Sequence, residues 1–100
     1  MPRFIVRPLA EADVQAAFDW YEERAAGLGH EFLRAIDVCY ATIERSPELY
    51  PVVYRGLRRA LLRRFPYAVY YVITADTIQI AGCVHGRRHP RRWMRRALDA

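Results

Sequence analysis

The sequence predicts an α+β fold with the element order β-α-α-β-β-β, in which a helical hairpin packs on one face of a small, mainly antiparallel sheet. Two consecutive segments in the first half repeat apolar residues every three or four positions, as amphipathic helices do. Two adjacent apolar runs in the second half, residues 68–74 and 77–85, have the length of strands. With 100 residues and 53% hydrophobic composition, we expect one domain over residues 1–100.

The first half of the chain predicts one strand and two helices. Polar and apolar side chains alternate over residues 3–7, and a helix begins after Pro8, near position 9 or 10. Glycines in the Gly27-Leu28-Gly29 segment break that helix, and Ser46-Pro47 ends the second one. The expected apolar faces are Val14, Ala17, Phe18, Tyr21 and Ala25, then Phe32, Ile36, Cys39, Tyr40 and Ile43. We expect the helix–sheet interface to consist of Phe18, Tyr21, Phe32, Ile36 and Ile43.

The second half predicts the rest of the sheet. Residues 48–56 form a loop with at most a short extended piece, and residues 57–64 are an ambiguous strand candidate. Residues 68–74 are apolar on both faces, which predicts a central strand, followed by a turn at Ala75-Asp76. Strict alternation along 77–85 directs Ile78, Ile80 and Val84 toward the helices, and Gln79, Ala81, Cys83 and His85 toward the opposite, partner-facing side. Pro90 can begin a short C-terminal helix.

Charge is distributed unevenly along the chain. Up to Tyr54 there are five arginines and nine acidic residues, whereas eleven arginines and only Asp76 and Asp99 follow. The formal charge is therefore −4 in the first part and +9 in the second, which predicts a surface for an anionic partner. All sixteen basic residues are arginine, so guanidinium groups are present to bind carboxylate or phosphate, and no lysine is present as a titratable base.

The cysteines and the N-terminus indicate a protein of the reducing cytoplasm. Cys39 and Cys83 lie far apart without metal-ligand spacing, so we expect two buried free thiols, no metal site and no cofactor. The apolar run after Met1 is too short for a secretory signal, and no stretch has the length of a membrane span. We therefore expect a cytoplasmic protein without a membrane partner.

Three groups of residues resemble the RelE/ParE superfamily of type II toxin–antitoxin toxins. They are Trp20-Tyr21-Glu22 with Gly27-Leu28-Gly29 and Phe32; Phe65-Pro66-Tyr67 with Tyr71, Ile78 and Ile80; and the segment from Val84 to Pro90 (VHGRRHP) with Trp93. The resemblance covers about ninety residues. It implies a small toxin bound by a cognate antitoxin, in a heterodimer or heterotetramer.

Within that superfamily the resemblance leaves two activities open. RelE-like members cut mRNA on the ribosome, a reaction that needs an acid, a base and cations around the phosphate. Here His85, Arg64 and Arg87 are the candidate catalytic residues, but the lysines and C-terminal tyrosine of the RelE pattern are missing. ParE-like members inhibit DNA gyrase and need no hydrolytic site. The Trp20-Tyr21-Glu22 signature favours this ParE-like branch, and a nucleic-acid-binding module without toxicity is the third option.

The residues expected to bind a partner lie mainly in the C-terminal tail. They are Arg87, Arg88, Arg91, Arg92, Trp93, Arg95 and Arg96, together with Trp20 on the first helix. The residues of this tail, and the candidate catalytic residue His85, have simpler structural explanations as well. The arginine run can be a solvated basic edge, Trp93 can cap the core, and His85 can be a structural histidine bonded to backbone.

Overall fold

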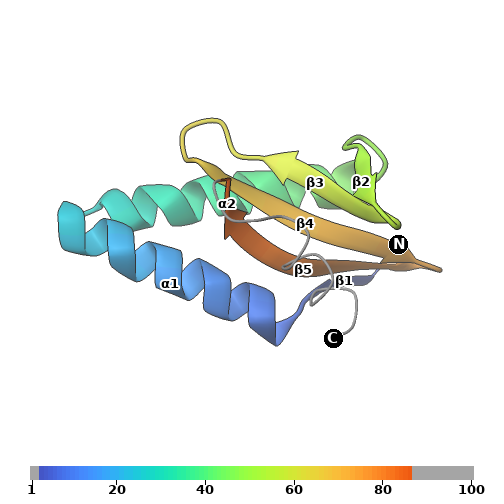
Figure 1. Ribbon diagram of the computed structural model, residues 1–100, viewed down its shortest axis with the longest axis horizontal. Helices are drawn as coiled ribbons and strands as arrows, with labels where there is room; N and C mark the ends of the chain where they lie inside the picture. The colour runs from blue at the N-terminus through green and yellow to red at the C-terminus, as the bar shows by residue number, and fades with distance from the viewer. Residues whose placement is uncertain (1–2, 87–100) are drawn as a thin grey trace.

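The computed structural model describes residues 3–86, and within them it has two helices and a five-stranded sheet. The elements are β1 (Arg3–Val6), α1 (Pro8–Arg24), α2 (Leu28–Arg45), β2 (Val52–Tyr54), β3 (Leu57–Leu61), β4 (Tyr67–Thr74) and β5 (Thr77–His85). Both helices lie on the same side of the sheet (Figure 1). The predicted α+β class, the helical hairpin and the order of the elements are confirmed, and β2 is the short extended piece of the 48–56 loop.

The sheet is mixed, with the strand order β1-β5-β4-β3-β2. Only β1 pairs in parallel, with β5, and the other three pairings are antiparallel. β4 therefore lies inside the sheet, as its apolar residues on both faces predict. It is connected to β5 by the predicted turn, where Ala75 adopts a positive φ of 51°.

Proline and glycine set the boundaries of the helical hairpin. α1 begins at Pro8, where the missing N–H of proline costs the helix nothing. Ala25, expected on the apolar face of this helix, lies beyond its end and is exposed, so that expectation is wrong. Gly27 precedes α2 with a φ of +89°, a left-handed conformation that favours glycine.

The main core lies between the helices and the sheet. Tyr21, Phe32, Ile36 and Ile43 are buried there, as predicted, against side chains of β4 and β5. The fifth predicted residue, Phe18, is only partly buried. Its ring packs over Gly29 and contacts the edge of His30, so it contributes to the contact between the helices rather than to the core on the sheet.

A β-bulge in β5 corrects the predicted assignment of its two faces. Tyr70 pairs with Gly82 and Tyr71 pairs with Ile80, so Ala81 is an extra residue in β5. One extra residue reverses the alternation of side chains beyond it. Cys83 therefore lies in the core under the helices, and Val84 joins the apolar cluster of the opposite face.

The same bulge moves His85, which was expected on the side opposite the helices. His85 pairs with Tyr67, which packs against the helix-side core, so both side chains lie on the helix side of the sheet. The opposite face has its own buried cluster, made of Leu57, Ala68, Tyr70, Val72, Ala81 and Val84. Neither helix in residues 3–86 combines the length and apolar character required to span a membrane. The helix expected from Pro90 lies outside the described residues.

Candidate partner-binding site

His85 is the one histidine among the candidate catalytic residues, and it lies within the part of the chain that the structure describes. It ends β5 and is half-buried, and its ring meets the ring of Tyr67 edge-on at a centroid distance of 5.2 Å. Tyr67 in turn contacts Tyr21 and Phe32. His85 thus continues an aromatic cluster that reaches from the core to the end of the sheet, which is consistent with a packing role for its ring.

Arg64 lies in the loop between β3 and β4, at the same end of the sheet as His85. Its guanidinium forms an ion pair with Glu31 in the first turn of α2, with 2.7 Å between Nη2 and Oε1. The adjacent Phe65 is buried against Tyr21 and Phe32 and anchors the loop. The ion pair thus directs Arg64 toward α2, whereas His85 packs on Tyr67. Arg87, the third candidate catalytic residue, lies outside the described residues.

Trp20 is exposed to 49%, although tryptophan is normally well buried. The guanidinium of Arg24 lies 3.6 Å from the centre of its ring, and Tyr21 meets the ring edge-on. Arg24 also donates a hydrogen bond to the carbonyl oxygen of Trp20. The pair forms a fixed apolar and cationic surface on α1. The other predicted partner-binding residues, Arg87, Arg88, Arg91, Arg92, Trp93, Arg95 and Arg96, lie outside the described residues.

The thiols of Cys39 and Cys83 and the phenol of Tyr71 all have raised pKa values. Cys39 and Cys83 are free and buried, as predicted, and burial raises the pKa of their thiols to about 11 and about 12. Burial also raises the pKa of Tyr71 to about 12, and its hydroxyl donates a hydrogen bond to the carbonyl oxygen of Pro47. Within residues 3–86 no group of three His, Cys, Asp or Glu side chains is arranged to hold a metal ion.

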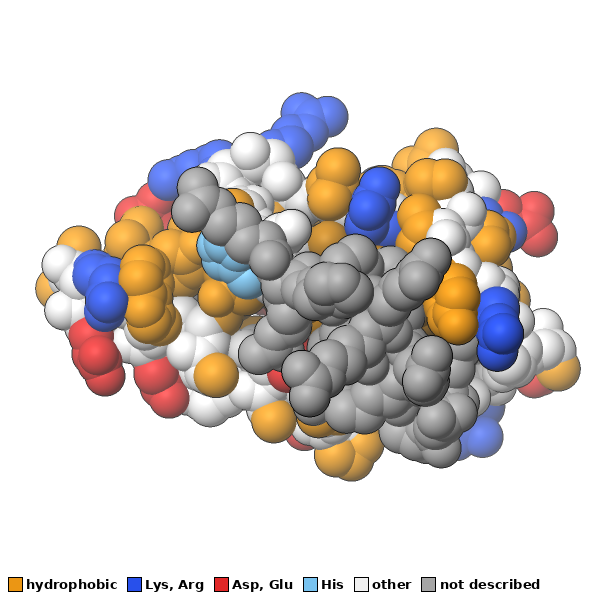
Figure 2. Space-filling view, viewed as in Figure 1, with side chains coloured by type: hydrophobic (Ala, Val, Ile, Leu, Met, Phe, Trp, Pro, Cys, Tyr) orange, Lys and Arg blue, Asp and Glu red, His pale blue; other side chains and the backbone are white. Residues whose placement is uncertain are grey.

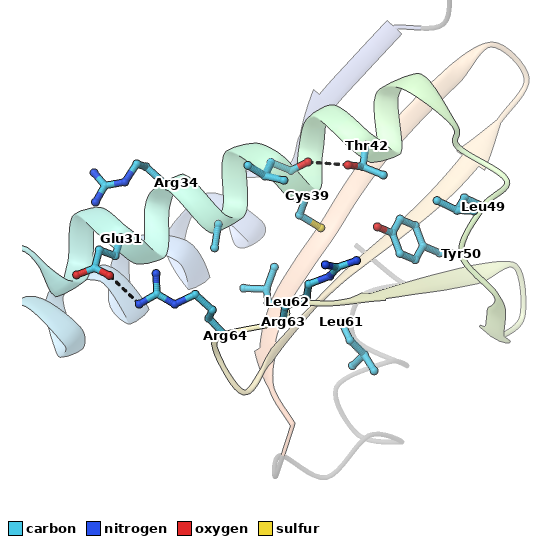
Figure 3. A pocket seen from close by; sticks show the side chains of 12 residues that line it. Glu31, Arg34, Cys39, Thr42, Leu49, Tyr50, Leu61, Leu62, Arg63 and Arg64 are labelled. Carbon is cyan, nitrogen blue, oxygen red and sulfur yellow. Dashed lines mark hydrogen bonds and ion pairs between the residues drawn. The ribbon is translucent and has the colours of Figure 1, made fainter.

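A hollow between α2, the loop after it and β3 was missed by sequence reasoning. It has a volume of about 650 Å³ and is lined by Glu31, Arg34, Ala35, Val38, Cys39, Thr42, Leu49, Tyr50, Leu61, Leu62, Arg63 and Arg64; we call it the α2–β3 groove. Val38, Leu49 and Leu61 are each more than 60% exposed there. The Arg63 side chain points into the groove between Cys39 and Tyr50 (Figure 3). The sequence did contain one sign of this groove: Val38 lies off the apolar stripe of α2, so an apolar side chain faces solvent.

Two acidic residues, Glu22 and Asp13, make hydrogen bonds that stabilise the hairpin and the sheet and that the sequence did not predict. The carboxylate of Glu22 accepts hydrogen bonds from the N–H groups of Gly27 and Gly29, both at 2.9 Å. These bonds, that of Gly27 above all, lower the pKa of Glu22. Asp13 accepts a hydrogen bond from the N–H of Cys83 at 3.1 Å and so ties α1 to β5 just beyond the bulge.

Arginines and acidic side chains are intermixed on the face shown in Figure 2. Arginines lie along its upper edge, over the loop between β3 and β4, and also at its left and right ends, whereas acidic side chains lie at the lower left, over α1, and also at the upper left and on the right.

Comparison with known proteins identifies the class of fold and then the family. The fold resembles that of a solved structure titled "Chromosomal ParDE TA system from P. aeruginosa", with a TM-score of 0.64 and 20% identity, over 85% of this chain and 96% of that one. Residues 4–90 match the family described as "ParE toxin of type II toxin-antitoxin system, parDE", so the chain belongs to the ParE toxin family. Comparison with curated proteins gave no significant match.

Proposed function

We propose that this protein is the toxin of a type II toxin–antitoxin module, that a cognate antitoxin neutralises it, and that the free toxin arrests growth by inhibiting DNA gyrase. The single observation that carries the proposal is the match of residues 4–90 to the ParE toxin family. Neutralisation by a cognate antitoxin, inhibition of gyrase and action in the cytoplasm are all parts of this proposal.

The surroundings of the candidate catalytic residues favour gyrase inhibition over RNA cleavage. A ribonuclease of this size needs a base and an acid that can both reach one phosphate. The Arg64 guanidinium is paired with Glu31, and the His85 ring packs on Tyr67. The hydroxyl of Tyr71 is committed to Pro47 and remains protonated. A gyrase inhibitor needs none of these groups for chemistry.

Ribosome-dependent mRNA cleavage is the second candidate. It is favoured by one observation: His85 and Arg64 lie at the same end of the sheet, the first ending β5 and the second just before β4. That end is also where the arginine-rich segment from Arg87 follows in the sequence. In this alternative His85 is the general acid or base and Arg64 and Arg87 stabilise the phosphate charge.

The arginines of the C-terminal segment are proposed to contact both partners. Bound to an acidic antitoxin they pair with carboxylates, and in the free toxin they engage gyrase or its DNA. Arginine contacts with DNA phosphates release counterions, and arginine contacts with carboxylates are screened by salt. The affinity for either partner should therefore decrease as the salt concentration rises.

The test is induced expression of the full chain without antitoxin, with DNA synthesis and protein synthesis followed separately by thymidine and methionine incorporation. Early loss of DNA synthesis together with an SOS response is the expected result. Early loss of protein synthesis with cleaved mRNA would replace this proposal with the ribonuclease. Unimpaired growth at verified expression would overturn the toxin assignment for this chain.

A further inference from the structure

The α2–β3 groove collects most of the exposed large hydrophobic side chains of residues 3–86. Five such side chains are more than 45% exposed in that part of the chain: Trp20, Val38, Leu49, Val52 and Leu61. Three of them line this one groove. Isolated apolar residues on a surface need no explanation, but apolar residues gathered around a hollow mark a binding surface.

Hydrogen bonds fix the wall of the groove that carries Leu49 and Tyr50. Arg58 on β3 donates hydrogen bonds to the carbonyl oxygens of Glu48 and Tyr50, at 3.3 and 2.6 Å. The hydroxyl of Tyr71 donates to the carbonyl oxygen of Pro47 at 2.7 Å. The loop is therefore held in place by β3 and β4 before any partner arrives, which lowers the entropy lost on binding.

The charge of the groove identifies the kind of partner. Glu31 and Arg64 neutralise each other through their ion pair (Figure 3). Arg34 and Arg63 also line the groove, and neither forms an ion pair within residues 3–86. A partner that fits must therefore bring carboxylates for two guanidinium groups and apolar side chains for the surface between them.

We propose that the α2–β3 groove binds an acidic, amphipathic segment of the antitoxin, with Val38, Leu49 and Leu61 as the apolar contacts and Arg34 and Arg63 as the charged ones. The inference rests on the proposed function, because it assigns the antitoxin to this groove. It adds a contact region to the arginine-rich segment and Trp20, where the sequence-based expectation placed the contacts.

The same features disfavour two other occupants. A second copy of the chain, docked groove to groove around a two-fold axis, would bring further copies of Arg34 and Arg63 into the interface, and Glu31, the only acidic residue within residues 3–86 that lines the groove, is already paired with Arg64. Nucleic acid would satisfy the arginines through phosphates but would leave Val38, Leu49 and Leu61 without apolar partners.

The test compares charge reversal inside and outside the groove in the full chain. Arg34→Glu with Arg63→Glu is measured for binding to the full-length antitoxin by calorimetry at low and high salt. The matched control is Arg45→Glu with Arg55→Glu, which reverses two exposed arginines outside the groove. We expect the groove variant to bind about tenfold more weakly or worse, and the control to bind as the wild type does. Leu61→Asp, with Val52→Asp as its control, repeats the comparison for the apolar contacts.

A growth assay separates this inference from the proposed function. Groove variants that stay toxic but are no longer rescued by co-expressed antitoxin support the groove as its binding site. Unchanged antitoxin affinity of both groove variants would overturn the inference and leave the toxin–antitoxin proposal intact. A wild-type chain that binds no antitoxin would overturn both. A wild-type dimer that Leu61→Asp converts to a monomer would assign the groove to a second copy and overturn the inference.

Discussion

Glu22 Oε1 accepts a hydrogen bond from the backbone N–H of Gly29 at 2.9 Å, so a side chain of α1 caps the start of α2. Its other oxygen binds the N–H of Gly27 in the same way. The first N–H groups of a helix have no partners within it, and a carboxylate there also interacts favourably with the helix dipole. The Glu22 and glycine signature that resembles the ParE-like branch is thus, in physical terms, a clamp at the bend of the hairpin.

Substitution of Gly29 by alanine is expected to open this clamp. A Cβ at position 29 would lie 2.8 Å from both the ring and the carbonyl oxygen of Phe18, and 2.9 Å from Glu22 Oε1. The backbone oxygen cannot move without separating the helices. Gly27→Ala is the comparison: nothing lies within 4 Å, so it should lose only about 1 kcal/mol, from its positive φ. Urea unfolding of both variants should show the larger loss for Gly29→Ala, and equal losses would contradict the close packing.

Acid should weaken the same clamp. Hydrogen bonds from the backbone, that of Gly27 first, lower the pKa of Glu22 from its ordinary value of 4.5. A group whose folded-state pKa is depressed stabilises the protein fully above the unfolded-state pKa, and this contribution is lost as the pH falls through the folded-state value. We therefore expect thermal stability to fall below about pH 4.5, and less steeply in Glu22→Gln. Glu23→Gln, which removes the adjacent exposed carboxylate, should retain the wild-type slope.

Phe32 should be among the most costly positions to truncate. Its side chain is fully buried and contacts the rings of Tyr21, Phe65 and Tyr67. Phe32→Ala removes these contacts and leaves a cavity, so the free energy of unfolding should fall by ~3–5 kcal/mol. Phe18→Ala should cost less because Phe18 is only partly buried. A change of under about 0.5 kcal/mol for Phe32→Ala would remove it from the core.

His85→Gln discriminates between the two activities. If the protein inhibits gyrase, the histidine takes no part in chemistry, and growth arrest by the folded variant should match the wild type. A ribonuclease that used His85 as acid or base would lose about 10²–10⁴-fold in cleavage rate. Inhibition of DNA synthesis in induced cells is the readout, with circular dichroism to verify the fold. Loss of toxicity in a folded variant would point to RNA cleavage.

Arg87→Ala with Arg88→Ala tests the arginine-rich segment predicted from the sequence. We expect weaker growth arrest or weaker antitoxin binding, with a smaller dependence on salt, because two guanidinium contacts are lost. Arg45→Ala, an exposed arginine at the end of α2, is the control. Wild-type toxicity and wild-type antitoxin affinity in the double variant would show that this segment serves neither partner.

Local patterns were sufficient to predict most of the fold. Apolar spacing and glycine or proline breaks define α1 and α2, and side chains apolar on both faces define β4. The errors arise where geometry depends on distant residues. Nothing in the alternation of residues 77–85 reveals the extra residue at Ala81, so the assignments of Cys83, Val84 and His85 to the two faces were wrong.

The candidate site was less accessible to sequence reasoning than the fold. The aromatic surroundings of His85 and the ion pair of Arg64 with Glu31 each join residues far apart in the chain. The α2–β3 groove is lined by a helix, a loop and a strand, and the sequence pattern of each element does not predict that the three lie together. Arginine content predicted an anionic partner, but only the fold shows which arginines surround an apolar surface.

The bulge at Ala81 determines which face of the sheet each later side chain of β5 points to, because side chains alternate along a strand. Removing Ala81 alone would restore simple alternation, turn Val84 toward the helices and turn Cys83 and His85 away from them. A one-residue deletion would thereby move the remaining side chains of this strand end to the opposite face of the sheet without any substitution. Members of the same family that are one residue shorter at this point are therefore expected to expose a different set of side chains on each face of the strand end.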